Sequence, residues 1–380
     1  MDFDLSEEQR LIQETARRFA EREIAPHAKE YDRAEKYPRE IVAKAAEVGL
    51  VAPIIPEEYG GPGFGFLEQA LITEQLTRVD LGIGQVIEAA AFGSQTILFH
   101  GSPEQKAKYL PPLVTGQEIS AGAFTEPDAG TDLAAARTRA VADGDDFIIN
   151  GNKIFITNGT VCNFMIVFCL TDPDHPSRHQ RHSLILVEAD RPGVTASKIR
   201  GKMGIRASDT AEIAFENVRV PQSHLIGQPG QGFRQLMHFF DVTRTSVAAE
   251  AVGLAQGALD LALRYTAERT TFGRPLNTNQ GLQFQLAEMA TKIELARTMC
   301  YKTAWLVDQG RPDPAQNAMA KYFAAETAVW VVDKALQMHG GYGYIDEYDI
   351  QRFYRDAKIL EIYEGAKEAE KITIARRLIG

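Results

Sequence analysis

The sequence predicts an α+β fold in which a helical N-terminal domain, a small antiparallel β-barrel and a C-terminal four-helix bundle follow one another. Three observations support this prediction. Apolar side chains recur at helical spacing up to about residue 120, short strand-like runs follow Gly122, and long helical patterns return from Phe233. The chain has 380 residues, of which 44% are hydrophobic, enough for several cores. We therefore expect domains over residues 1–121, 122–232 and 233–380.

The N-terminal region begins with a capping-box pattern at Ser6–Gln9, which satisfies free backbone donors at a helix start. Apolar residues at helical spacing follow, and Pro26 is expected to end this first helix. The segment Pro56–Gly63 reads as a loop between later helices.

The middle region contains short apolar runs separated by turn residues, as expected for several strands. These runs are Phe147–Asn150, Lys153–Thr157, Phe164–Leu170, Ser183–Glu188 and Glu212–Phe215. Asn150-Gly151 predicts a tight turn between the first two runs. Gly227–Gly232 lacks the spacing of a nucleotide-binding fingerprint and is interpreted as a hinge.

The last third of the chain consists of long helical patterns joined by short connections, which favours an up-down bundle. The expected helices are Phe233–Arg269, Thr278–Gln309, Pro314–His339 and Gly365–Leu378.

Charge and cysteine content exclude several classes of function. The net charge of −10 and the pI near 5.4 disfavour binding to nucleic acid or to anionic membranes. The three cysteines form no C-x-x-C pair, which indicates reduced structural thiols. The longest apolar run, Phe164–Leu170, is too short to span a membrane, and the acidic residues 1–6 do not resemble a signal peptide. We expect a cytoplasmic protein.

No metal site is predicted. His175, His179 and His182 are close in sequence, but they fall in or beside the polar loop Asp172–Arg181, where a solvated loop is the better reading. The sequence contains no nucleophile elbow and no phosphate-binding loop.

Four sequence strings indicate a function. They are Ala123–Asp132, Glu268–Gly273, Gln337–Tyr344 with the following Arg355-Asp356, and Ile362–Gly365. Together and in this order they resemble the signatures of the acyl-CoA dehydrogenase family, and the resemblance spans the whole chain. It implies FAD as cofactor, an acyl-CoA thioester as substrate, an electron-transferring flavoprotein as electron acceptor, and assembly as a homotetramer.

The resemblance also implies two groups of FAD-binding residues. The first group lines the flavin of its own subunit and comprises Phe124, Thr125, Gly130, Thr131, Phe155, Thr157 and Ala366. The second group belongs to segments that reach a neighbour's cofactor and comprises Arg269, Thr271, Phe272, Gln280, Gln337, Gly340 and Gly341. Structural interpretations without a cofactor also stay open. Thr157 could be present for its preference for strands, Arg269 for its favourable position at a helix end, and Gly340-Gly341 as a helix C-cap.

Glu364 matches the catalytic base of the family. The α-proton of a thioester is weakly acidic, so a carboxylate needs desolvation and hydrogen bonds to the thioester carbonyl to remove it. Some subfamilies carry their base just before the position of Arg244, but this chain has Thr243 there. Outside this motif, Glu364 would read as an acid near a helix N-terminus.

The substrate-binding residues implied by the resemblance are Thr131, Asp241, Arg244, Tyr363, Gly365 and Glu88. Glu88 falls where medium-chain enzymes carry a Glu at the pocket floor, although a solvated helix position is nearly as good a reading. Ile83 stands where glutaryl-CoA enzymes hold an Arg. We therefore expect a monocarboxylic substrate of short to medium length, or an alicyclic one.

The sequence departs from the family at two places. Ala366–Glu370 replaces the usual Thr or Ser and Gln near the flavin, and Phe124 is bulkier than the usual aliphatic residue. Three alternatives stay open: an oxidase that uses O₂, an alicyclic acyl-CoA dehydrogenase, and a DNA-associated homologue. The last requires a basic C-terminal stripe, and residues 365–380 carry only a mild excess of positive charge.

Overall fold

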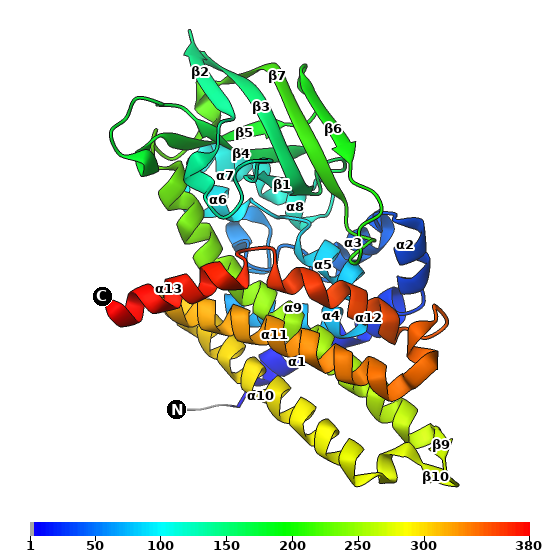
Figure 1. Cartoon of the computed structure of the whole chain (residues 1–380). Coiled ribbons are helices and arrows are strands. Elements are labelled where there is room, and N and C mark those ends of the chain that lie inside the picture. The colour runs from blue at the N-terminus through cyan, green and yellow to red at the C-terminus, as the bar shows by residue number, and fades with distance from the viewer. Residues whose placement is uncertain (1–3) are drawn as a thin grey trace.

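The structure is a computed structural model that describes residues 4–380. The first three residues, part of the acidic terminus considered above, lie outside the described range. The β domain lies at one end of the molecule and the long helices of the C-terminal region at the other, with the N-terminal helices packed against both (Figure 1). The predicted order of helical, β and helical regions is confirmed.

The N-terminal region is helical. Its helices are α1 (Glu7–Phe19), η1 (Ala20–Ile24), α2 (Ala28–Ala34), α3 (Arg39–Glu47), η2 (Glu57–Tyr59), α4 (Phe66–Val79), α5 (Leu81–Glu88), α6 (Gln95–His100), α7 (Pro103–Tyr109) and α8 (Pro111–Val114). The capping box is present, since the Ser6 hydroxyl accepts from the Gln9 N–H at 3.1 Å. The α-helix ends at Phe19, but the helical segment continues through the π-helical turn η1 to Ile24, two residues before Pro26, where the end of the first helix was predicted.

The middle region forms one eight-stranded sheet in the order β6-β7-β3-β2-β4-β5-β8, with β1 beside β4. Its strands are β1 (Ser120–Ala123), β2 (Arg139–Asp143), β3 (Asp146–Thr157), β4 (Phe164–Leu170), β5 (His182–Glu188), β6 (Val194–Lys198), β7 (Thr210–Pro221) and β8 (Leu225–Ile226). Two pairings, β1 with β4 and β2 with β4, are parallel, so the expectation of a purely antiparallel domain is corrected.

Asn150-Gly151 does not form the predicted tight turn. Both residues lie inside the continuous strand β3, where the register with β7 shifts between Ile149 and Gly151. A Cβ on Gly151, whose φ is 148°, would lie 2.7 Å from the Cα of Thr138. The glycine is therefore required for close approach of two chain segments within a bulge, which local turn statistics do not distinguish from a hairpin.

The C-terminal region contains four long helices and one short one. They are α9 (Gly232–Glu268), α10 (Gln280–Asp308), α11 (Pro314–His339), α12 (Ile350–Ala357) and α13 (Lys367–Ile379), with a small hairpin of β9 (Thr270–Thr271) and β10 (Arg274–Pro275) between α9 and α10. α9 is long and apolar enough to cross a membrane, but 78% of its most apolar window is buried inside the protein, as in a core helix.

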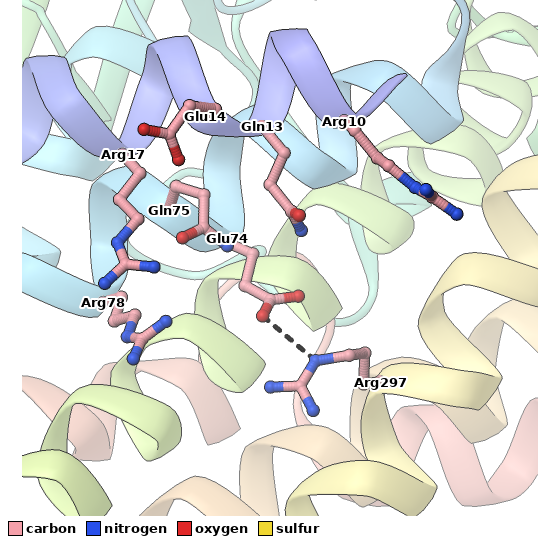
Figure 2. Close-up of a pocket in the computed structure, with 8 residues that line it drawn as sticks. All are labelled: Arg10, Gln13, Glu14, Arg17, Glu74, Gln75, Arg78 and Arg297. Atoms are coloured by element: carbon pink, nitrogen blue, oxygen red, sulfur yellow. Dashed lines mark hydrogen bonds and ion pairs between the residues drawn. The ribbon is translucent and has the colours of Figure 1, made fainter. Parts of the chain in front are cut away.

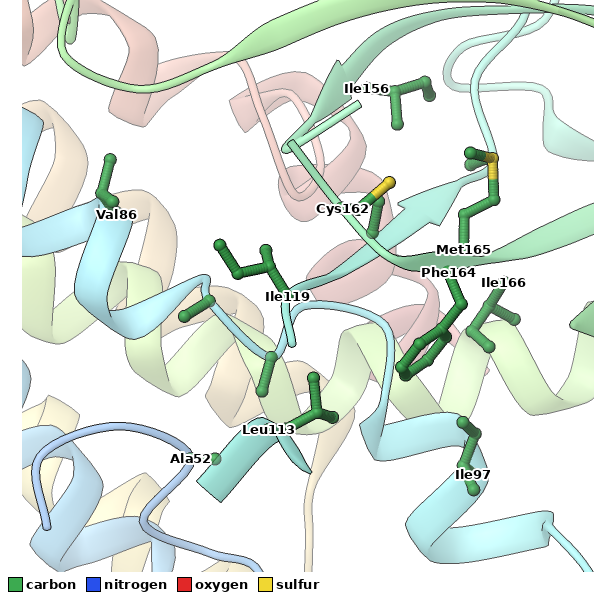
Figure 3. Packing of buried hydrophobic residues seen from close by; sticks show 14 of the residues in the cluster. Ala52, Val86, Ile97, Leu113, Ile119, Ile156, Cys162, Phe164, Met165 and Ile166 are labelled. Carbon is green, nitrogen blue, oxygen red and sulfur yellow. The ribbon is translucent and has the colours of Figure 1, made fainter. Parts of the chain in front are cut away.

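Two hydrophobic clusters form the core. The first joins the N-terminal helices to the sheet through residues such as Ile119, Ile156 and Phe164 (Figure 3). The second lies among α9, α10, α11 and α12. Asn158, at the end of β3, donates hydrogen bonds to the carbonyls of Ala89 and Ser120 and so ties the sheet to the N-terminal helices. The first half of α9 passes beside this junction (Figure 1).

Candidate active site

Glu364 lies in the loop that joins η8 (Lys358–Glu361) to α13. Its backbone is left-handed, with φ of 54°, a conformation that costs free energy for any residue other than glycine. Gly365 follows with φ of 109°, and its carbonyl accepts a hydrogen bond of 2.5 Å from the fully buried Lys321 on α11. The helical bundle therefore anchors the main chain of this strained loop through the hydrogen bond from Lys321.

The Glu364 side chain points at α9. Its Oε2 accepts a hydrogen bond of 2.6 Å from the Thr243 hydroxyl. Burial raises the pKa of the Glu364 carboxyl, while the Thr243 hydrogen bond lowers it in part. The positive charges of Arg244 and Lys321 act in the same direction as that hydrogen bond. The result is a desolvated carboxyl with a raised pKa, the state expected of a general base for a weak carbon acid.

Arg244 lies between two acids. It forms ion pairs of 3.1 Å with Asp241 and with Glu370, which is fully buried in the first turn of α13. Burial raises the pKa of Glu370 to about 7. The structure thus brings Asp241 and Arg244 together with Glu364, as the sequence implied, and adds Glu370 and Lys321, which the sequence analysis missed.

Tyr363 connects the loop to a second acid. Its hydroxyl donates a short hydrogen bond to Glu250 on α9, whose pKa burial raises well above the ordinary carboxyl value. Glu250 follows Thr243 by seven residues, two helical turns, and so lies on the same face of α9. This spacing was a usable signal that the sequence analysis did not exploit. Glu88 lies near the same group, because its charge contributes to the raised pKa of Glu250.

The two segments expected to line the flavin lie side by side. The Ile154 N–H donates to the Thr125 carbonyl at 3.0 Å, and the buried Lys153 donates to the Phe124 carbonyl at 3.0 Å and to Glu126 at 2.8 Å. Phe155 has a left-handed φ of 58° and exposes 65% of its surface at an irregularity of β3. An exposed aromatic ring at a fixed bulge beside a loop of polar residues fits a planar, partly polar ring system.

Phe124 directs its side chain into the protein. Its ring is 4% exposed and packs against Phe92, Phe239 and Phe240, with ring centroids 5.6 to 6.3 Å apart. The extra bulk at this position therefore fills the core beside the start of α9. Its ring is therefore not exposed for contact with a cofactor, and its carbonyl already accepts from Lys153.

The remaining members of the first group occupy positions consistent with binding. Thr131 is exposed on the loop after Thr125, and a Cβ on Gly130 would meet no atom within 4 Å. Thr157 is half-buried at the end of β3, and Ala366 caps α13.

The second group of predicted FAD residues lies elsewhere in the chain. The hairpin that carries Thr271 projects at the end of the bundle opposite the β domain (Figure 1). Phe272 at its tip is fully exposed, and the Arg269 guanidinium lies 5.6 Å from the ring centroid of Tyr342, which links the hairpin to the end of α11. Gly340 and Gly341 have open space around them. Gln280 begins α10 and Gln337 lies in the last turn of α11.

One pocket lies away from this site. A pocket of about 500 Å³ between α1, α4 and α10 is lined by arginines and acids (Figure 2). Its cations already have partners: Arg297 pairs with Glu74 at 3.0 Å, and Arg78 with Asp260 at 2.6 Å. It contains no group of the Glu364 site, so we assign it no part in catalysis.

Known proteins match this three-part fold and its sequence. Models of the acyl-CoA dehydrogenase N-terminal, middle and C-terminal domains match residues 6–117, 121–218 and 230–379. The acryloyl-CoA reductase (NADH) of Anaerotignum propionicum is 42% identical over 381 residues, which cover 100% of this chain and 96% of that protein.

Solved structures agree. Butyryl-CoA dehydrogenase from Megasphaera elsdenii aligns with a TM-score of 0.96 at 36% identity, with all of both chains covered. A chain in a structure described as the electron transferring flavoprotein of Acidaminococcus fermentans aligns with a TM-score of 0.97 at 42% identity, again over all of both chains. This chain belongs to the acyl-CoA dehydrogenase family. It is an FAD-dependent oxidoreductase, so the predicted fold, enzyme class and cofactor are confirmed.

Proposed function

We propose that this enzyme converts a monocarboxylic acyl-CoA of short to medium length, or an alicyclic one, into the 2-enoyl-CoA, with Glu364 as the base. The observation that carries the proposal is the desolvated Glu364 carboxyl in a loop whose main chain is anchored by Lys321. FAD, when bound along Thr125, Thr131 and Phe155, supplies the acceptor for the β-hydride.

Glu364 takes the α-proton as the hydride leaves the β-carbon, so the C–H electrons of the α-carbon become the new double bond. Its backbone also contributes. Among residues 4–380, no acceptor is found for the backbone N–H of Glu364. A free N–H next to the base is suited to the thioester oxygen, where negative charge develops as the α-proton leaves. Thr243 orients the carboxyl through its 2.6 Å hydrogen bond.

The assembly belongs to the same proposal. The hairpin of β9 and β10 lies at the end of the molecule away from the β domain (Figure 1), and the open surroundings of Phe272 and Gly340 leave room for the cofactor of a neighbouring subunit. We therefore propose a homotetramer with shared FAD sites, located in the cytoplasm. An electron-transferring flavoprotein takes the electrons from the reduced enzyme, in keeping with the protein named in one of the solved structures.

Replacing Glu364 with Gln tests the assignment of the base. Gln keeps the size and polar tip but cannot accept the proton, so the variant should stay yellow, bind acyl-CoA and lose 10²–10⁴-fold or more in the rate of anaerobic flavin bleaching. Glu368→Gln, an exposed position in the first turn of α13, is the matched control and should bleach normally. Near-normal bleaching by Glu364→Gln would refute the assignment. Reoxidation of the bleached enzyme in air at the rate of turnover would instead indicate an oxidase.

A further inference from the structure

Three consecutive residues around the base each form one hydrogen bond to a side chain of a helix. We call this segment, residues 363–365, the base loop. Its three hydrogen bonds join Tyr363 to Glu250, Glu364 to Thr243, and Gly365 to Lys321. Two of the helix side chains belong to α9 and the third to α11. The bond to Glu250 is the one for which the proposed reaction gives no reason.

Glu250 is a buried acid without a counter-ion. It is 2% exposed, and no ion pair with a lysine or an arginine is found for it in the described part of the chain. Burial and the negative charge of Glu88 raise its pKa well above the ordinary carboxyl value, while the hydrogen bond from Tyr363 lowers that pKa in part. The charge of Glu364 raises the pKa further, and that of Lys321 lowers it. The balance favours a protonated, neutral Glu250.

A neutral acid at this position is suited to holding Tyr363. One of its oxygens accepts from the Tyr363 hydroxyl, which stays protonated because burial raises the pKa of the tyrosine. The neighbours of Glu250 along α9, from Val247 to Val252, are all small or apolar. A methionine would be buried here at a lower cost in free energy than an acid. The hydrogen bond to Tyr363 is therefore what distinguishes Glu250 from an ordinary core residue.

α9 gives the base loop two contact points at a fixed separation. Thr243 and Glu250 are seven residues apart in a continuous helix, so they lie on one face and about 10 Å apart along its axis. Tyr363 contacts one point and Glu364 the other. Two contacts on one rigid helix limit rotation of the loop about either of them. The Tyr363 contact therefore helps to fix the direction in which the Glu364 carboxyl points.

The backbone of Glu364 is constrained from both sides. Its φ of 54° is a sparsely populated conformation, which persists only where the surrounding structure enforces it. Lys321 holds the residue that follows the base, and Glu250 holds Tyr363, the residue that precedes it. Without Glu250 the strained backbone can relax, and a change of φ at Glu364 moves its carboxyl relative to Thr243.

We propose that Glu250 is a positioning residue for the base, and that through Tyr363 it sets the orientation in which the Glu364 carboxyl meets the α-carbon of the substrate. This proposal rests on the proposed function, since it requires Glu364 to remove the α-proton. Glu250 takes no proton from the substrate in this role. It supplies a hydrogen-bond acceptor, so a neutral amide of the same shape should replace it.

Two substitutions of Glu250 test this role in the purified holoenzyme. Glu250→Gln reproduces the acceptor and the donor of a neutral acid, whereas Glu250→Met keeps the volume and removes both. Glu250→Met should lower the limiting rate of anaerobic flavin bleaching by butyryl-CoA about 10-fold to 100-fold, because a displacement of about 1 Å at a reacting group can cost 10²-fold. Glu250→Gln should stay within about threefold of the parent. Both should keep their FAD content and their half-saturating butyryl-CoA concentration.

Tyr363→Phe removes the same hydrogen bond from the other side. If Glu250 acts through Tyr363, the double variant Tyr363→Phe/Glu250→Met should be no slower than the slower of the two single variants. Multiplication of the two losses would show that Glu250 acts independently of Tyr363 and would overturn the proposal.

Thr245→Val is the control for general damage to α9. Thr245 is 1% exposed, and its hydroxyl donates to the Val242 carbonyl of the same helix at 2.7 Å. The valine variant loses a buried hydrogen bond on α9 without touching the base loop, so it should bleach at the rate of the parent. A loss as large as that of Glu250→Met would overturn the proposal, because damage to the helix would then suffice.

The comparison of Gln with Met at position 250 decides the role of the acid. Parent-like rates in both variants show that the bond does not position the base, and slow rates in both show that the proton or charge of Glu250 matters instead. Either result overturns the proposal. The pH dependence of bleaching should also be the same in Glu250→Gln and the parent, since one neutral group replaces another. A midpoint displaced to lower pH would reveal a negative Glu250 that raises the pKa of Glu364 by its charge, and would overturn the positioning role.

Failure of the inference and failure of the proposed function give different results. A parent that butyryl-CoA and hexanoyl-CoA bleach, with Glu364→Gln inactive and Glu250→Met normal, retains the dehydrogenase reaction and loses only the inference. A parent that neither thioester bleaches, or a Glu364→Gln variant that bleaches normally, overturns both.

Discussion

Replacing Lys153 with Met tests how the flavin-lining loop is fixed. Lys153 is 1% exposed, and its ammonium lies 2.8 Å from the Glu126 carboxylate and 3.0 Å from the Phe124 carbonyl. Met preserves most of the side-chain volume but removes the charge. The substitution therefore leaves the buried Glu126 without its counter-ion and the Phe124 carbonyl without its side-chain donor.

The size of the stability loss depends on the hydrogen bonds that Glu126 keeps after the substitution. Breaking a buried ion pair by removing one member costs about 3–5 kcal/mol. Glu126 keeps two backbone donors, the N–H groups of Arg137 at 2.6 Å and Thr138 at 2.8 Å, so we expect the lower end, about 3 kcal/mol. Since the lost bonds anchor the segment before Thr125, FAD retention should fall as well.

Urea unfolding followed by circular dichroism, with the flavin-to-protein absorbance ratio of the purified enzyme, measures both effects. The surface variant Lys334→Met breaks a pair of 3.3 Å with Asp333 and should cost less than about 1 kcal/mol. The double variant Lys153→Met/Glu126→Gln should recover part of the lost stability, because no buried charge is left unpaired. The reasoning fails if Lys153→Met alone unfolds within about 1 kcal/mol of the parent and keeps its full flavin content.

Three further predictions concern ionisation, assembly and substrate. Burial raises the pKa of Glu88 to about 7, so the folded protein holds this proton more tightly than the unfolded chain, and the free energy of unfolding falls as pH rises from about 4.5 to 7. Over that range, Glu88→Gln should gain up to about 3 kcal/mol in the free energy of unfolding relative to its parent. A difference between the two in urea unfolding that does not change with pH would contradict this. Arg269→Ala should weaken FAD binding by about 1–3 kcal/mol and shift the oligomer toward smaller species in sedimentation. A variant that keeps its full FAD content and its oligomeric state would argue against a shared site. Butyryl-CoA or hexanoyl-CoA should be oxidised faster than glutaryl-CoA, and the opposite order in the bleaching assay would rule out the monocarboxylic assignment.

Helix positions were predictable wherever a long apolar period was uninterrupted. α11 begins at Pro314 and ends at His339 as expected, because a proline at the first helical turn and a glycine after the last are strong local signals. α12 was missed because its eight residues fall between two recognisable motifs and are too few for a periodic signal. The parallel pairing of β1 with β4 depends on contacts across more than forty residues, which no local pattern encodes.

The residues of the candidate site also fall into two groups, those that a sequence motif identified and those that only the structure revealed. Residues with a motif around them, such as Glu364 and Arg244, were identified from the sequence, and the structure brings them together. Lys321, Glu250 and Glu370 were not identified, since an isolated charged residue in a helix is normally solvated. Their importance arises from burial, which only the packing of α9, α11 and α13 determines. For Lys321, the available warning was a single charge in an otherwise mostly small and apolar stretch, Asn317–Ala325.

Lys321 has a consequence for how such enzymes diverge. Its ammonium donates a hydrogen bond to the backbone carbonyl of Gly365, a group that every amino acid possesses, and makes no hydrogen bond to the side chain at position 364. The loop geometry is therefore independent of the reactive group it presents. Descendants of this chain could exchange Glu364 for Asn or Gly, which tolerate a left-handed backbone, and keep the surrounding architecture. A carboxylate gained at position 243, across the 2.6 Å contact, could then take over proton removal. Relocation of the base between helix and loop thus requires two substitutions and no refolding.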